Sequence, residues 1–140
     1  MLRELCVWLS TLPPCTAVKR LEHGYWQFCF GNACGFMVSC PWRITHRGQI
    51  FLGRDDDRQM FGRKEPLDAE VEALVLLGSS PVIAAEIVDG TADLWINFAS
   101  GVRLEVFNLS CGYEGWSGSV KINDRTLSLV ACGGGGLSIF

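Results

Sequence analysis

The sequence predicts an α+β fold in which two tandem-duplicated units, each a helix followed by an antiparallel meander, form one domain. The first reason is an internal repeat, because positions 4–38 match positions 72–106 without a gap. The second is that apolar and polar residues alternate on both sides of a glycine-containing turn in each half, which is typical of a β-hairpin. Two copies favour a duplicated unit over a solenoid. The identical pairs are Glu4–Glu72, Val7–Val75, Leu9–Leu77, Pro13–Pro81, Ala17–Ala85, Phe30–Phe98 and Val38–Val106.

Each half is expected to begin with a short helix. In the first half, Pro13-Pro14 ends a segment whose apolar residues have helical spacing. The same segment recurs inside the chain, so we interpret it as a structural helix and not as a secretory leader. In the second half, Asp68 is the expected N-cap and Gly78 the expected C-cap. The apolar face of the first helix comprises Leu2, Leu5, Cys6 and Leu9.

Strands follow each helix. The alternation predicts hairpins over 26–38 and 94–106, with a strand before each at 16–21 and 82–88. Residues 54–66, which contain a mixed cluster of charges, are expected to be an exposed link between a first unit at 1–53 and a second at 67–140. The sheets of the two units then either join edge to edge or pack face to face. Further strands are expected at 42–45, 49–52, 117–122, 126–131 and 137–140.

Composition limits the classes of partner. The net charge is −3, and nucleic-acid binding requires a basic face, so no nucleic-acid partner is expected. No apolar run approaches the roughly 18 residues of a membrane span, so no membrane partner is expected either. Charged residues make up 19% of the chain, below the roughly 25% usual for soluble proteins. This shortage indicates that part of the surface is covered, either in a homodimer or by another protein.

The seven cysteines are predicted to be free thiols. Their number is odd, no CxxC pair occurs, and several replace apolar residues of the repeat. This usage favours the reducing cytoplasm. Cys29, Cys34 and Cys40 with a histidine are ligand types for zinc, but they lack paired spacing, and core packing is the favoured interpretation. A cysteine–histidine enzyme would have to use His23 or His46, and neither lies in a nucleophile motif.

Two short runs resemble ligand-binding loops without their full pattern. Asp55, Asp56 and Asp57 lack the glycine and distal glutamate of a calcium loop, so we interpret them as an exposed acidic turn. The glycines at 133–136 lack the Lys-Ser/Thr that follows in a phosphate-binding loop. No catalytic residue, metal or cofactor is therefore predicted.

Aromatic segments follow both hairpins and supply the candidate partner-binding residues. Tyrosine, tryptophan and arginine often anchor protein interfaces because they bury much area and lose few torsions. The alternative for the two tryptophans is that they plug the ends of the core. The candidates are Trp42, Arg43, Tyr113, Glu114 and Trp116, together with Asp55, Asp56 and Asp57.

The second half also carries a family resemblance. Residues 94–106 followed by Gly112-Tyr113-Glu114-Gly115-Trp116 are similar to small uncharacterised bacterial proteins with an apolar-x-Phe-x-x-Gly-x-x-Leu-x-Val pattern followed by Tyr-Glu-x-Trp. Such families resemble toxin-immunity proteins, and related chains occur as orphan products of mobile elements. Trp42-Arg43-Ile44, before a glycine turn, looks like the first unit of that family. The resemblance implies no catalytic residues.

These observations lead to a functional expectation. We expect a non-enzymatic, cytoplasmic, immunity-type protein that neutralises a cognate toxin by covering it. We also expect a homodimer when the partner is absent, formed through the C-terminal strand or the aromatic turns. The alternative is a small-molecule-binding protein or hydrolase with a cleft between the two units. That alternative requires a concave pocket holding a titratable cluster, such as His46 near Glu114 or an aspartate of the 55–57 run.

Overall fold

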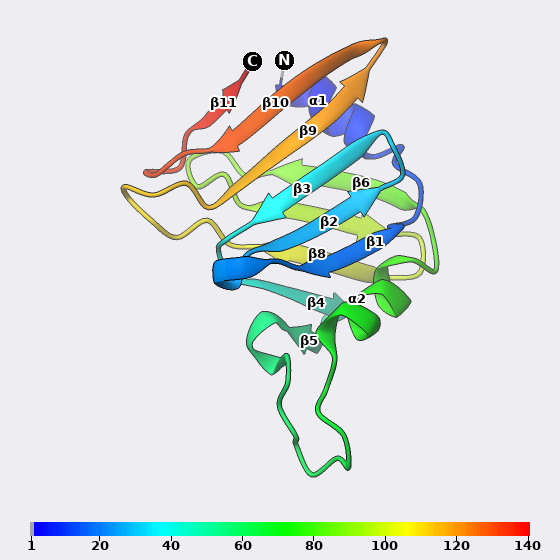
Figure 1. The fold of residues 1–140 in the computed structure, drawn as a ribbon. Helices are drawn as coiled ribbons and strands as arrows, with labels where there is room; N and C mark the ends of the chain where they lie inside the picture. Colours follow the sequence, from blue (N-terminus) through cyan, green and yellow to red (C-terminus); the bar gives the residue numbers. More distant parts are fainter. Residues whose placement is uncertain (1) are drawn as a thin grey trace.

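The computed structural model describes residues 2–140, which form two antiparallel sheets and two α-helices (Figure 1). Sheet A has the strand order β1-β2-β3-β9-β10-β11 and sheet B has the order β5-β4-β8-β7-β6. The chain is therefore α+β and mostly β. The strands of sheet A are β1 (Ala17–Arg20), β2 (Trp26–Phe30), β3 (Cys34–Val38), β9 (Trp116–Ile122), β10 (Arg125–Ala131) and β11 (Leu137–Ile139). Those of sheet B are β4 (Trp42–His46), β5 (Gln49–Gly53), β6 (Val82–Ile87), β7 (Leu94–Phe98) and β8 (Val102–Val106).

The core lies between the two sheets. Trp42 on β4 packs edge-on against Trp26 and Phe28 of β2, with ring centroids 5.1 and 5.2 Å apart. Farther along, Phe98 on β7 stacks on Phe30 with centroids 6.2 Å apart. These aromatic contacts join sheet A to sheet B, and the alternation of buried and partly exposed residues along β2 and β7 follows from strand geometry.

Each half of the chain contributes to both sheets, which differs from the expected pair of self-contained meanders. Strands β1 to β3 lie in sheet A, whereas β4 and β5 lie in sheet B beside β8. Conversely, β6 to β8 lie in sheet B, and β9 and β10 lie beside β3 in sheet A. The crossings occur in residues 39–41 and 107–115. Pro41 lacks a ladder donor, and the next residue, Trp42, is inserted into the core.

The helices cover one edge of each sheet. Helix α1 (Leu2–Leu9) leads into a segment in which the Leu12 carbonyl accepts from Val82 N–H on β6 at 3.1 Å. Helix α2 (Ala69–Leu77) lies against β1, where the Leu77 carbonyl accepts from Cys15 N–H at 3.1 Å. Open strand edges promote aggregation, so these contacts protect β6 and β1. Neither helix in residues 2–140 has the length and apolar character needed to cross a bilayer.

The expected elements are confirmed closely. Both hairpins occupy the expected residues, a helix precedes each half, and every predicted strand is present within about two residues at its ends. The Asp68 side chain caps α2 by accepting from Glu70 N–H at 3.0 Å, and Gly78 is the C-cap. The 3-10 turns η1 (Glu22–Gly24) and η2 (Arg54–Asp56) were not expected. Both border the pocket described next.

Candidate functional site

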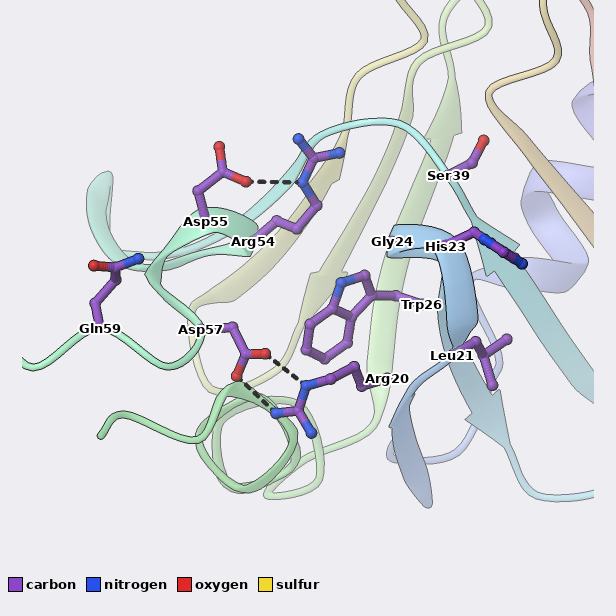
Figure 2. A pocket seen from close by; sticks show the side chains of 10 residues that line it. All are labelled: Arg20, Leu21, His23, Gly24, Trp26, Ser39, Arg54, Asp55, Asp57 and Gln59. Atoms are coloured by element: carbon purple, nitrogen blue, oxygen red, sulfur yellow. Dashed lines mark hydrogen bonds and ion pairs between the residues drawn. The ribbon is translucent and has the colours of Figure 1, made fainter. Parts of the chain in front are cut away.

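A concave site lies at one end of the two sheets and is here called the Trp26 pocket (Figure 2). It is an open pocket of about 640 Å³. Its walls come from η1, the crossing from β3 to β4, and the start of the 54–66 segment, with the end of β1 and Trp26 between them. The residues that line it are Arg20, Leu21, His23, Gly24, Trp26, Ser39, Arg54, Asp55, Asp57 and Gln59.

Arg20 organises one wall of this pocket. Its Nε and Nη2 donate to the two carboxylate oxygens of Asp57 at 2.6 and 2.7 Å, as Figure 2 shows. Nη2 also donates to Asp68, and Nη1 donates to Glu70, each at 3.1 Å. The guanidinium also lies 5.4 Å from the ring centroid of Trp26, in the geometry of a cation–π contact. Three carboxylates therefore hold one arginine in place, and each of its three side-chain nitrogens donates to at least one of them.

Charge pairing shifts the pKa values of this pair. Burial alone raises the pKa of Asp57, but hydrogen bonds from Arg20 and from Ala69 N–H outweigh it and hold that pKa below its usual value. The hydrogen bond to Asp57 raises the pKa of Arg20, against the opposing effect of burial. Both groups are therefore charged at neutral pH. A charged, fully bonded carboxylate is a structural link and not a general acid.

The three consecutive aspartates have different environments. Asp57 is nearly buried and ties the 54–66 segment to β1 and α2 through Arg20 and Ala69. Asp56 accepts from Gly53 N–H at 2.8 Å and closes the η2 turn. Asp55 is exposed and bonds to Arg54 at 3.1 Å. The prediction of one exposed acidic turn is therefore right for Asp55 and wrong for Asp57, because Arg20 neutralises that carboxylate.

The histidines do not complete a catalytic group with these aspartates. His23 is exposed, and its nearest charged partner is Glu22 at 3.9 Å. His46 contacts the Ser100 carbonyl at 3.3 Å and packs against Phe51. The lining of the Trp26 pocket therefore includes His23 with Asp55 and Asp57, and it does not include His46. In residues 2–140, no group of three or more histidine, cysteine or acidic residues has metal-binding geometry.

A second feature lies on the outer face of sheet B and is here called the arginine–aromatic face, made of Arg43, Trp95, Arg103, Glu105 and Phe107. Glu105 is at its centre and is 9% exposed. In the strand register Glu105 pairs with Arg43 on β4 and with Trp95 on β7. Arg43 Nε donates to Glu105 Oε1 at 2.5 Å, and Arg103 Nε lies 3.4 Å from Glu105 Oε2.

The two arginines of this face each lie over an aromatic ring. The Cζ of Arg43 is 5.2 Å from the ring centroid of Phe107, and that of Arg103 is 4.9 Å from Trp95. The two rings contact each other edge-on at 5.2 Å. A depression of about 310 Å³ runs beside both arginines. Stacking and the shared glutamate hold both guanidinium groups in position before any partner arrives.

The candidate partner-binding residues lie in four places. Trp42 and Trp116 are each 2% exposed, so the alternative that they plug the core is the correct one. Arg43 belongs to the arginine–aromatic face. Tyr113 and Glu114 are exposed on the loop from β8 to β9. Asp55 and Asp57 line the Trp26 pocket, and Asp56 lies beside them in η2.

Sequence reasoning missed four members of the arginine–aromatic face and the role of Arg20. The alternation along 102–106 does place Arg103 and Glu105 on one face. Their meeting with Arg43 depends on β4 lying beside β8, which joins residues 62 positions apart. The alternation of apolar and polar residues within each strand does not predict that β4 pairs with β8.

The cysteines occur as free thiols, and three of them are buried. Burial raises the pKa of Cys15 and of Cys40 to about 11 and that of Cys34 to about 12. A thiol with a raised pKa is a weak nucleophile at neutral pH. These three residues therefore act as small core hydrophobes.

Comparisons with protein-family models, curated proteins and solved structures found no match to this chain.

Proposed function

We propose that this chain is a non-enzymatic protein that binds another protein through the arginine–aromatic face. The observation that supports it most is the pair of arginines fixed over Trp95 and Phe107 around the buried Glu105. Arginine and aromatic residues dominate the energetics of protein interfaces. In the described residues, the hydrogen bond of Arg43 and the ion pair of Arg103 use Nε, so the terminal nitrogens are available to a partner.

The chemistry of the face defines the partner. Two guanidinium groups stand against one glutamate, which leaves an excess of one positive charge on this face. Planar guanidinium groups bind carboxylates with two parallel hydrogen bonds. The partner should therefore present carboxylates beside an apolar patch that packs on the two rings. From the resemblance to immunity proteins, we propose a toxin as this partner and the cytoplasm as the compartment.

Co-expression with the candidate toxin tests the proposal. Wild-type chain should restore the growth of cells that produce the cognate toxin, which we propose is encoded beside its gene. The double variant Arg43→Glu, Arg103→Glu should lose this protection, since it replaces both donors with acidic groups. Arg125→Glu, an exposed arginine on β10 in sheet A, is the matched control and should protect fully. Equal protection by both variants, or none by the wild type, would refute the proposal.

The Trp26 pocket supports a second candidate, a small-molecule-binding protein. Its volume of about 640 Å³ falls in the range of ligand pockets, and it contains aspartates of the 55–57 run. Against a hydrolase stands the absence, in the described lining, of a nucleophile bonded to a base. Assays of the purified chain with ester and phosphoester substrates test the hydrolase alternative, and turnover above background would favour it over a non-enzymatic protein.

We also propose that the two halves derive from one duplicated unit. Supporting this, β3 pairs with β9 in the same register in which β8 pairs with β4: Val38 faces Trp116, and Val106 faces Trp42. Phe36 with Gly118 and Leu104 with Ile44 follow the same correspondence. A related single-unit chain that assembles as a strand-exchanged dimer would support the duplication. Relatives in which only one half recurs with other partners would contradict it.

A further inference from the structure

Trp42 and Trp116 occupy corresponding places but have different neighbours. Each is the first residue of a strand that enters the opposite sheet, and each faces a valine of the repeat, Val106 or Val38. Trp116 Nε1 donates to the Ala92 carbonyl at 2.7 Å. Trp42 Nε1 is buried without a hydrogen-bond acceptor. The position that matches Ala92 is Gly24, which lines the Trp26 pocket.

The connections before the two tryptophans also differ in length. Residues 107–115 precede Trp116, whereas only residues 39–41 precede Trp42. Within the longer connection, Asn108 Nδ2 donates to the carbonyls of Thr91 and Cys132 at 2.9 and 3.1 Å. These bonds pull three loops together and leave a space of about 230 Å³ beside Thr91. The shorter connection has no such loop, and the Trp26 pocket of about 640 Å³ lies at the matching place.

The outer part of the longer connection is itself unpacked. Leu109 is 70% exposed and Tyr113 is 83% exposed, although both are large apolar side chains. The loop and the pocket share a rim, because Ser39, a pocket residue, donates through Oγ to the carbonyls of Glu114 and Gly115 at 3.3 and 3.0 Å. Figure 1 shows the β8–β9 loop at the same end of the sheets as η1 and η2.

We infer that two copies of this chain associate about a two-fold axis near Ser39, with the Tyr113 loop of each copy seated in the Trp26 pocket of the other. Such closure is isologous: it covers both exposed loops and leaves none to recruit further copies. Leu21 is partly exposed in the lining and offers an apolar contact to the Tyr113 ring, while Trp26, 3% exposed, lies below it. Asp55 is exposed, and its ion pair with Arg54 uses Oδ1, so its carboxylate can also accept from the tyrosine hydroxyl.

This site uses neither arginine of the arginine–aromatic face, so the inference stands or fails separately from the proposed function. A partner copy at the pocket also explains why a chain with 19% charged residues keeps large apolar groups on an exposed loop.

Sedimentation equilibrium of the full chain at micromolar concentrations tests the inference. The wild type should be a dimer, and Tyr113→Ala should raise the dissociation constant by at least about thirtyfold, the loss expected for a central aromatic anchor. Asp55→Lys, on the pocket side, should weaken the dimer too, and circular dichroism should show both variants folded. Phe140→Ser removes an equally exposed aromatic group at the β11 edge and should leave the dimer intact.

Mixing the variants tests the exchange between copies. A heterodimer of Tyr113→Ala with Asp55→Lys keeps one intact loop in one intact pocket, whereas each homodimer keeps none. Native mass spectrometry should therefore show the heterodimer in excess of the statistical mixture. A monomer at all concentrations would overturn the inference, as would a dimer that survives Tyr113→Ala. A dimer lost only in Phe140→Ser would assign association to the β11 edge instead.

Discussion

Replacing each aspartate of the 55–57 run in turn should produce three different losses of stability. Asp57→Ala removes two short hydrogen bonds to Arg20 and the acceptor of Ala69 N–H, at a side chain that is 12% exposed. Hydrogen bonds to charged groups contribute about 1.5–3 kcal/mol, and Asp68 and Glu70 remain to hold Arg20. The expected loss is about 2–4 kcal/mol.

Its two neighbours are the controls. Asp56→Ala loses one bond to a backbone N–H and should cost about 1 kcal/mol. Asp55 is 89% exposed, and its loss should cost less than about 0.5 kcal/mol. Urea unfolding followed by tryptophan fluorescence measures all three, and with a slope of about 2 kcal/mol/M the Asp57 variant should shift the midpoint by about 1–2 M. Equal losses at Asp55 and Asp57 would refute the assignment of Asp57 as the anchor.

Three further outcomes are expected. The folded-state pKa of Asp57 lies below its unfolded value of about 3.9, so its stabilisation is present above that pH and is lost as pH falls through the folded pKa. Asp57→Asn should therefore lose less stability on acidification than the wild type does, as measured by urea unfolding at a series of pH values. An equal loss of stability with falling pH in both chains would contradict this. Gly115→Ala places a methyl group onto the Asn108 side chain and should lower stability by about 1–3 kcal/mol in the same assay, whereas a neutral effect would mean that the loop shifts freely. Trp116→Phe should cost about 1–3 kcal/mol more than Trp42→Phe by thermal unfolding, since only Trp116 has a carbonyl partner to abandon, and equal costs would count against this difference.

Much of the local structure was predictable from the sequence. Period-two alternation placed both hairpins, and proline, glycine and Asp68 marked the helix ends, because these features depend on neighbours only a few residues away. The same alternation predicts that Trp42 is buried, because it shares a strand face with the apolar Ile44, whereas Arg43 lies on the opposite face. Residue type alone, which suits an interface anchor and a core residue equally, led to the wrong choice.

The exchange of strands between halves was not predictable in this way. A repeat indicates that two units are alike but not which strands pair, and both meanders had the same local pattern. Likewise, three identical residues at 55–57 do not indicate that Asp57 is nearly buried and Asp55 exposed. The distinction comes from Arg20, 37 positions away, which β1 and the path of the 54–66 segment bring to Asp57. The Trp26 pocket has the same origin, since its lining comes from three separate stretches of the chain, at 20–26, 39 and 54–59.

The most direct test of protein binding through the arginine–aromatic face is the dissociation constant for the toxin that we propose as the partner, measured by titration calorimetry with wild-type chain, Arg103→Glu and Arg125→Glu. The account predicts that Arg103→Glu weakens binding at least about thirtyfold, because the guanidinium held over Trp95 is lost and a carboxylate faces the partner's own. Arg125→Glu should bind as the wild type does. Equal affinities for all three chains would contradict the account.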